Sequence, residues 1–450
     1  MTNPDGKLRN FLSDTPQWFL NSYAVFFAFM TYFCMYAFRK PFSAAQYINY
    51  YFFSTQIELK TALVVGQILG YACSKALGIK FCSEAKRGQR PILLGGLILC
   101  AELALVLFAV LPQNLKIIAI FFNGLPLGMV WGLVVRYLEG RRASEILLAG
   151  LSCSFIVSSG VVKDVGRALL AGDSLRIFGI SLPNPFSAVS EFWMPAATGL
   201  LFLLPFLLAV WFLDHLPEPS AEDILARTAR QTMDGSQRWE FLLRFLPGMA
   251  MLIVSYVLLT AFRDYRDNYM VDILGELGYT YEKHKDLVTN MELGVAFGVM
   301  FAMALLFFIK DNHLGLLAVL AMIGSGMILI GLATLLCQAK AIGGVTWMAL
   351  TGLGTYLAYV PYNSVLFDRL IASTRFAGTA VFAIYLADTM GYTGSIAVQL
   401  YKDLGSEATT RAGFLEGYGY IVSIIGALLT LGSGIYFVSK RAQSPNAQVT

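Results

Sequence analysis

Histidine and charged residues are scarce in this chain. Three histidines occur among 450 residues, and 14% of the residues are charged, whereas an ordinary soluble domain carries about 25%. His215, His284 and His313 fall in predicted loops, which argues against a histidine metal site. The HExxH, P-loop and nucleophile–histidine patterns are also missing from the sequence. We therefore expect no enzyme activity, no metal and no cofactor.

The few cysteines do not form a disulfide or zinc pattern. They lie in or beside apolar stretches without CxxC spacing, and we expect them to pack as small apolar residues. They are Cys34, Cys73, Cys82, Cys100, Cys153 and Cys337. The net charge of +4 is not pooled in one basic patch, so a nucleic acid partner is not expected. A polar N-terminus before a long apolar stretch predicts no cleavable signal peptide.

Apolar residues dominate the rest of the chain. Hydrophobic residues make up 57% of it and aromatic residues 14%, with a mean hydropathy of +0.63. A spanning helix needs about 20 mostly apolar residues. Twelve candidate stretches lie near residues 18–47, 58–79, 91–111, 115–138, 145–170, 192–213, 241–271, 287–309, 314–337, 342–367, 376–400 and 416–438. The sequence thus predicts an all-α membrane protein with twelve transmembrane helices.

The longest polar segment divides these stretches into two sets of six. We predict an N-terminal six-helix bundle at residues 1–213, a cytoplasmic linker at 214–240, and a C-terminal six-helix bundle at 241–450. The linker has the pattern of a short amphipathic helix, although a plain covalent tether is favoured. Lysine and arginine are more frequent in the loops on the side of the N-terminus. This bias predicts a multi-pass protein of the bacterial inner membrane with both termini cytoplasmic.

The two halves share a short pattern. Tyr32 and Arg39 in YFCMYAFRK correspond to Tyr256 and Arg263 in YVLLTAFRD, with the same spacing and about half the chain between them. Parallel six-helix repeats are a known plan of transporters. The pattern predicts two pseudo-symmetric halves.

Two arginines interrupt predicted helices, where buried charge is costly and usually serves function. Arg39 and Arg263, one from each half, suit the binding of a carboxylate or phosphate, because a guanidinium stays charged and binds such groups through two hydrogen bonds. In the alternative interpretation, Arg263 pairs with Asp267 one turn later, and Arg39 pairs with a carboxylate of another helix. Arg266 is expected nearer the outer mouth.

A second group of charged residues is a candidate for ion coupling. It consists of Lys163, Asp164, Arg167, Asp267, Glu292 and Asp388, with Glu102 as a further charged residue in a predicted helix. Lys163 and Asp164 are adjacent on a helix, so they point about 100° apart and are expected to face different neighbours. Such groups can carry a proton in a low-dielectric cavity. A static ion-pair network that holds helices together is the alternative.

Tyrosines and one amide accompany these charges. They are Tyr32, Tyr36, Tyr256, Tyr359 and Asn363. Tyr32, Tyr36 and Arg39 share a helix face, which predicts a stripe that lines a pore. Interfacial belts or plain packing are the alternative.

Several short motifs resemble one family of carriers. The sequence from Tyr36 to Phe42, YAFRKPF, and the stretch GYACSK that ends at Lys75 are similar to helices one and two of the organophosphate:phosphate antiporters. These belong to the major facilitator superfamily. GMVW, MELGVAFG, YVP, AGTA and GYTGS follow in the order of that family's later helices. The resemblance implies an alternating-access fold, with Arg39 and Arg263 as phosphate ligands and Lys75 as the helix-two lysine.

The chain departs from that family at the centre of the expected site. Phe155 stands where the family has a histidine in helix five, and helix seven gains Asp264 and Asp267. These changes indicate a divergent member with another substrate or coupling ion.

Together these features predict a monomeric secondary transporter for a small polar solute. An organophosphate- or sugar-phosphate-like anion is favoured as the substrate, with a proton or phosphate as the candidate coupling ion and the lipid bilayer as the surroundings. Two alternatives remain. One is a ligand sensor on the same fold that does not transport, and the other is a proton-coupled transporter of a zwitterionic or sugar substrate.

Overall fold

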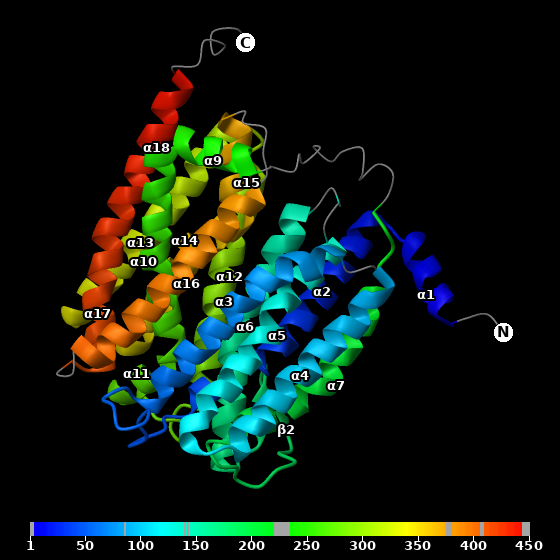
Figure 1. The fold of residues 1–450 in the computed structure, drawn as a ribbon, viewed down its shortest axis with the longest axis vertical. Coiled ribbons are helices and arrows are strands. Elements are labelled where there is room, and N and C mark those ends of the chain that lie inside the picture. Colours follow the sequence, from blue (N-terminus) through cyan, green and yellow to red (C-terminus); the bar gives the residue numbers. More distant parts are fainter. Residues whose placement is uncertain are drawn as a thin grey trace. The chain divides into compact units, whose positions relative to one another are not determined.

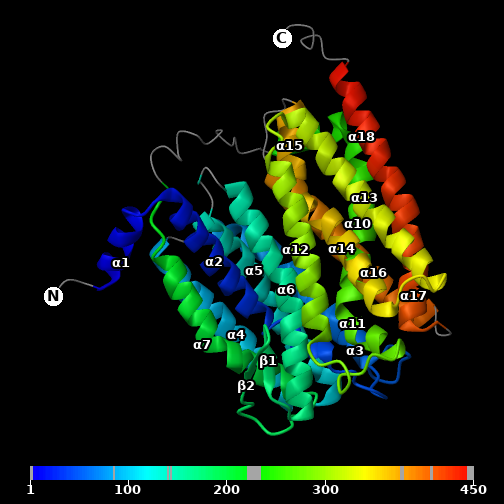
Figure 2. The same ribbon diagram turned by 180° about the vertical axis from the view of Figure 1, so that it is seen from behind.

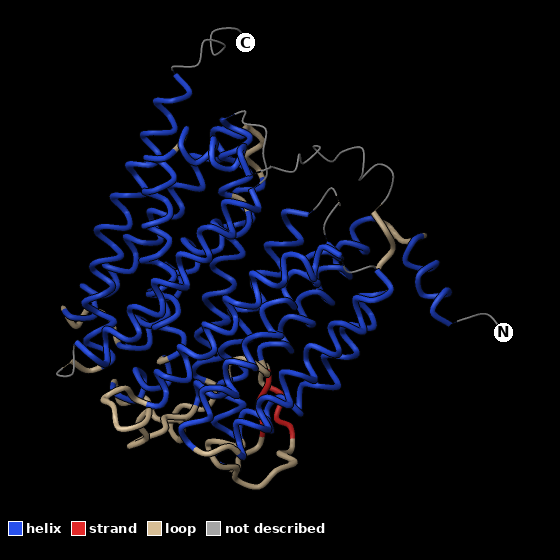
Figure 3. The backbone as a smooth tube through the Cα atoms, viewed as in Figure 1, coloured by secondary structure: helices blue, strands red, loops and turns tan. Residues whose placement is uncertain are grey.

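The computed structural model describes residues 4–84, 87–138, 141, 144–219, 235–374, 380–405 and 409–442. Within these residues the chain consists of helices and one short β-hairpin (Figures 1 and 3). Contacts divide the chain into two compact units.

The first unit comprises Met1–Arg227, Gly278–Leu293 and Asp403–Gly405. Its elements are α1 (Pro4–Ser13), α2 (Gln17–Tyr36), η1 (Pro41–Ala44), α3 (Leu59–Glu84), η2 (Arg87–Gln89), α4 (Arg90–Val110), η3 (Gln113–Leu115), α5 (Lys116–Leu138), α6 (Ser144–Ala171), β1 (Leu175–Ile177), β2 (Ile180–Leu182) and α7 (Met194–Asp214).

The second unit comprises Thr228–Leu277, Gly294–Lys402 and Ser406–Thr450. Its elements are α9 (Gly235–Arg244), α10 (Leu246–Asn268), α11 (Met270–Glu276), α12 (Leu287–Phe307), α13 (Asn312–Gln338), α14 (Gly344–Ser364), α15 (Leu366–Thr374), α16 (Ala380–Gly405), α17 (Arg411–Ile421), the π-helical turn η4 (Val422–Gly426) and α18 (Ala427–Ala442). The first residues of α12 and the last residues of α16 belong to the first unit.

Each of the twelve predicted spans overlaps a long helix of the described chain. Eight of these helices are long and apolar enough to cross a membrane: α2, α4, α5, α7, α10, α12, α13 and the continuous helix α17–η4–α18. The other four, α3, α6, α14 and α16, contain 26, 28, 21 and 26 residues. At 1.5 Å per residue, even the shortest spans about 30 Å, the thickness of the hydrocarbon core. Polar residues such as Lys75, Lys163 and Asp388 make α3, α6 and α16 less apolar.

The first predicted span is wrong in its length. The sequence predicts one helix over residues 18–47, but α2 ends at Tyr36, and the chain continues as a turn and then as the 3₁₀ helix η1. Pro41 gives the reason, because proline has no backbone N–H with which to continue the helical hydrogen bonds. Arg39 therefore lies at a break in the helix and not within a continuous one.

Glycines bring α3 and α5 into close contact. A Cβ atom at Gly70 would lie 2.1 Å from the carbonyl oxygen of Phe121, and one at Gly124 would lie 2.5 Å from the carbonyl oxygen of Gln67. Small residues allow membrane helices to approach to backbone contact. Each helix thus needs glycine at this crossing.

Four helix pairings of the first unit recur in the second. The pairs α2 with α7, α4 with α5, α4 with α7 and α2 with α5 recur as α10 with α18, α13 with α14, α13 with α18 and α10 with α14. In the second unit, Gly326 and Gly354 allow α13 and α14 to touch, since a Cβ atom on either glycine would lie within 2.5 Å of the other's carbonyl oxygen. These four recurring pairings are the ones that pseudo-symmetric halves predict.

A two-residue turn closes the β-hairpin between α6 and α7 (Figure 2). β1 and β2 pair antiparallel, with Ile177 opposite Ile180. The turn residues Phe178 and Gly179 both have positive φ, 52° and 81°, as the favoured hairpin turn of this length requires.

The predicted domain boundaries remain a prediction. α7 ends at Asp214 and α9 begins at Gly235, so part of the predicted linker at 214–240 is seen. The amphipathic helix predicted there falls mainly in residues 220–234, which lie outside the described residues.

Candidate functional site

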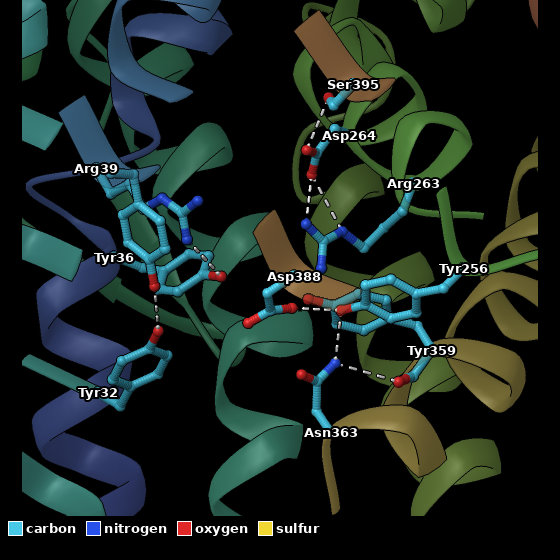
Figure 4. A network of polar contacts seen from close by, with 11 residues as sticks. Tyr32, Tyr36, Arg39, Tyr256, Arg263, Asp264, Tyr359, Asn363, Asp388 and Ser395 are labelled. Carbon is cyan, nitrogen blue, oxygen red and sulfur yellow. Dashed lines mark hydrogen bonds and ion pairs between the residues drawn. The ribbon is translucent and has the colours of Figure 1, made fainter. Parts of the chain in front are cut away.

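The first candidate cluster surrounds Arg39 in the first unit. Its side chain is buried, with 8% of the residue exposed. The guanidinium carbon lies 4.1 Å from the ring centre of Tyr71 and 5.5 Å from that of Tyr36. One guanidinium nitrogen, Nη1, also donates to the Tyr36 hydroxyl at 3.3 Å (Figure 4). The aromatic rings therefore hold a buried positive charge by cation–π attraction.

Two amide side chains hold the broken end of α2. Gln67 donates to the carbonyl oxygen of Arg39 at 2.8 Å, and Asn123 donates to that of Phe38 at 3.0 Å. Gln67 also donates to Asn123 at 2.9 Å. Carbonyls left without helical partners are costly inside a membrane, so these bonds stabilise the break. The sequence analysis missed both amides, although polar amides in apolar helices were a visible signal.

Tyr32 and Lys75 lie in the same cluster through Tyr71. The hydroxyls of Tyr32 and Tyr71 are 3.4 Å apart, and Lys75 Nζ lies 5.8 Å from the Tyr71 ring centre. Tyr71 precedes Lys75 by about one turn of α3. It was not among the predicted site residues, although it begins the motif that includes Lys75.

An aromatic row extends from Tyr32. Its ring centre lies 4.9 Å from that of Trp131, which lies 6.4 Å from that of Phe155. Phe155 therefore adds an apolar wall behind Tyr32.

The second candidate cluster surrounds Arg263 in the second unit. Its guanidinium carbon lies 3.9 Å from the ring centre of Tyr359. The side chain pairs with the adjacent Asp264, at 2.5 Å from Nη2 and 3.1 Å from Nε, and Ser395 donates to the same carboxylate at 2.9 Å. The sequence analysis weighed Asp267 as the partner, but the ion pair is with Asp264. A long arginine side chain can bend around the helix to reach its neighbour in sequence.

A hydrogen-bonded chain joins three further predicted residues (Figure 4). Tyr256 donates to Asp388 at 2.6 Å, and Asn363 donates to the Tyr256 hydroxyl at 3.0 Å. The Tyr256 and Tyr359 rings stack with centres 5.5 Å apart. Because Tyr359 also contacts the Arg263 guanidinium, this stack connects the hydrogen-bonded residues to Arg263. Five predicted residues therefore lie in one cluster of the second unit.

The predicted coupling residues of α6 form a separate cluster in the first unit. Asp164 pairs with Arg167 at 3.3 Å and accepts two hydrogen bonds from Thr289, one from its backbone N–H and one from its hydroxyl, both at 2.8 Å. Lys163 and Glu292 are completely buried. A Cβ atom at Gly160 would lie 3.1 Å from Glu292 Cβ, so α6 and the start of α12 are closely packed.

Charged loop residues continue this cluster beyond the helices. Lys285 pairs with Asp173 at 2.6 Å, and Arg176 pairs with Asp286 at 3.3 Å. The Lys285 ammonium, by hydrogen bonding, holds the pKa of Asp173 below its usual range. Burial raises the pKa of Tyr281, whose ring lies 4.9 Å from the Arg167 guanidinium carbon, to about 12. Tyr281 therefore stays neutral at physiological pH.

Arg266 and Asp267 are both buried. Arg266 is 1% exposed and donates to the carbonyl oxygen of Met348 at 2.7 Å. Its guanidinium occupies the space that a side chain at Gly352 would need. Asp267 is also buried, at 6% exposure. Among the described residues, no group of three or more His, Cys, Asp or Glu side chains is placed to hold a metal.

Several solved structures of transporters share this fold. A D-xylose-proton symporter matches with a TM-score of 0.59 at 15% identity, over 92% of this chain and 96% of the other. A mutant of the nucleoside transporter NupG matches with 0.56 at 14% identity, over 93% and 100%. The xylose transporter XylE from E. coli, in a partially occluded inward-open conformation, matches with 0.55 at 15% identity, over 96% and 99%.

These likenesses show the major facilitator fold that the sequence predicts, with its many membrane-spanning helices. No curated protein matches the chain. The family described as "Family of unknown function (DUF5690)" matches residues 41–440, and the chain therefore belongs to that family.

Proposed function

We propose that this protein is a secondary transporter that moves a small polar solute, with an organic anion favoured, by alternating access. The observation that carries the proposal is the buried Arg39 held against Tyr71 at the break in α2. A buried charge inside a membrane protein is costly unless it serves binding or pairing. A guanidinium also suits planar recognition of a carboxylate or phosphate. The fold neighbours named above are transporters, which supports this class of function.

Arg263 would be the second ligand of the solute. Its ion pair with Asp264 reduces the net positive charge that this cluster offers to an anion. We therefore assign the main anion contact to Arg39, with Lys75 beside it, and a weaker one to Arg263. The remaining predicted site residues would supply hydroxyl and amide groups to the polar parts of the solute. They are Tyr32, Tyr36, Tyr256, Tyr359 and Asn363.

A proton-coupled carrier of a sugar or zwitterion is the second candidate. The bond from Tyr256 to Asp388 favours it, because a carboxylate with a hydroxyl donor is a common way to hold a polar, uncharged ligand or a proton. One of the fold neighbours is a D-xylose-proton symporter. In this version Asp388 and Asp264 would take part in proton coupling.

The contacts of α6 and of the segment that follows it with residues 278–293 would close one end of the transport path. Asp164, Asp173 and Arg176 all bind this segment through charged or capping contacts. We propose that these contacts break and reform during the cycle, with Lys163, Arg167, Asp267 and Glu292 as supporting charges. Location in a bacterial inner membrane, cytoplasmic termini and action as a monomer remain parts of the proposal.

A thermal-shift screen of the purified protein tests the binding class. Inorganic phosphate, a sugar phosphate, a dicarboxylate, a free sugar and an amino sugar serve as probes, since a specific ligand raises the melting temperature by mass action. We expect an anion to stabilise the protein, and Arg39→Ala to weaken its binding by roughly tenfold or more. Arg244→Ala, at an exposed arginine of α9, is the matched control.

Uptake into proteoliposomes then separates transport from sensing. An anion that stabilises the protein and is taken up in an Arg39-dependent way supports the proposal. Stabilisation only by the free sugar, unchanged in Arg39→Ala, would favour the sugar carrier. Binding without any uptake would identify a sensor and overturn the transporter proposal.

A further inference from the structure

Glu102 is the one acidic residue of α4, and it lies near the middle of that 21-residue helix. Ile98 and Leu105, about one turn to either side, are buried, whereas Leu99 and Leu103 are 54% and 61% exposed. The half-buried Glu102 therefore sits at the border between the packed face of α4 and the face that meets lipid. This position is among the most costly for an ionised side chain.

The fold leaves a niche for the Glu102 carboxyl group. A Cβ atom at Gly199 of α7 would lie 2.1 Å from Glu102 Oε2 and 3.0 Å from a ring carbon of Phe38. The carboxyl thus occupies the space that the missing side chain of Gly199 provides. The walls of this niche are formed by α4, by α7 and by Phe38, which lies in the turn after α2.

No charged or hydrogen-bonding group of the described residues compensates this carboxyl. Its Oε2 atom is buried without a hydrogen-bond partner. α7 carries no charged residue before Asp214, its last residue, and α2 carries none at all. The Arg39 guanidinium lies on Tyr71 instead, and Lys116 of α5 donates to the carbonyl oxygens of Phe108 and Ala109.

We propose that Glu102 is a proton-binding carboxylic acid of the bilayer interior and a modification site for apolar carbodiimides. An unpaired carboxylate is strongly disfavoured in a low-dielectric niche, so the group binds a proton. A carbodiimide partitions into the lipid and meets the acid from the exposed side of α4. The inference is independent of which solute the protein moves.

The modification needs no co-reactant. The acid proton passes to one carbodiimide nitrogen, and the carboxylate oxygen bonds to the central carbon, which gives an O-acylisourea. An oxygen-to-nitrogen acyl shift then forms a stable N-acylurea, and no atom leaves. Ionised carboxylates at the water surface react poorly at neutral pH, since this step begins with the protonated acid.

Mass spectrometry of the full-length protein in liposomes tests the proposal. The probe is dicyclohexylcarbodiimide at about pH 7.5, near neutrality where surface carboxylates are ionised, followed by peptide mapping. We expect one dominant adduct on Glu102, its loss in Glu102→Gln and its retention in Glu240→Gln, the control at an exposed glutamate of α9. A water-soluble carbodiimide of the same reactivity should leave Glu102 unmodified.

Infrared spectroscopy gives a second readout that does not depend on reactivity. A carbonyl band of a protonated carboxylic acid should persist at about pH 8, well above the ordinary glutamate pKa, and disappear in Glu102→Gln. Equal modification by both carbodiimides would show a hydrated carboxylate and overturn the proposal. Absence of the dicyclohexylcarbodiimide adduct, or of the band that depends on Glu102, would overturn it as well.

Discussion

The carboxylate of Asp164 caps the first turn of α12 through Thr289. Its Oδ2 atom accepts both the backbone N–H and the hydroxyl of Thr289 at 2.8 Å. Thr289 is the third residue of α12, where backbone N–H groups have no helical partner. A negative charge there is also favoured by the helix dipole. One side chain thus links α6 to the start of another helix.

Removal of this cap should destabilise the protein. Asp164→Ala leaves the Thr289 N–H and the Arg167 guanidinium without their partner, and we expect a loss of about 1–3 kcal/mol of unfolding free energy. Thermal unfolding in detergent measures the effect. Asp286→Ala, whose ion pair with Arg176 is partly exposed, should cost less. Equal effects of the two variants would refute a special role for Asp164.

The hydrogen bonds that side-chain amides donate to the end of α2 should stabilise the folded protein by a similar free energy. Gln67→Leu removes the donor to the Arg39 carbonyl oxygen and leaves it unsatisfied in an apolar interior. We expect a destabilisation of about 1–3 kcal/mol. Gln17→Leu, at an exposed position near the start of α2, provides the control. An unchanged melting temperature in Gln67→Leu would mean that the break needs no such support.

The α3–α5 crossing should not tolerate a side chain at Gly70. In Gly70→Ala the new methyl group meets backbone atoms of α5, which cannot rotate away. The helices must separate, and we expect a loss of about 1–3 kcal/mol or more, seen as poor yield and a lower melting temperature. Gly96→Ala is the matched control, because a Cβ atom there has no neighbour within 4 Å. A stable Gly70→Ala protein would contradict this packing.

The Asp173–Lys285 pair should contribute a stability that depends on pH. The pKa of Asp173 is lower in the folded protein than the ordinary value of about 3.9. A depressed carboxyl pKa stabilises the folded state above the unfolded pKa, and this contribution is lost as pH falls through the folded value. Asp173→Asn should therefore lower the melting temperature modestly at about pH 5–8 and have less effect as pH falls below about 4.

The control for this experiment is Asp14→Asn, an exposed carboxylate of the N-terminal segment. It should not reproduce the pH profile. A difference between Asp173→Asn and the wild type that grows as pH falls would contradict the assigned sign.

The membrane class, the positions of the twelve helices and the repeat are predictable from the amino-acid sequence alone. In lipid, a long apolar stretch can satisfy its backbone hydrogen bonds only as a helix. Composition and length are therefore enough to predict the spanning helices. It also identified Arg39, Arg263, Asp164 and Asp388 as unusual, because charge inside such stretches is visible without any structure.

The partners of these residues, in contrast, become visible only in the folded protein. Arg263 pairs with Asp264 and not with Asp267, Arg39 lies on Tyr71, and Asp164 caps Thr289. Contacts between helices depend on the rotation of each helix about its axis and on the conformation of each side chain. Neither can be inferred from the spacing of residues along one helix. The glycine crossing at Gly70 follows the same rule, because the sequence does not show which helix packs against that glycine. The end of α2 differs, since Pro41 is a local signal that was visible in the sequence.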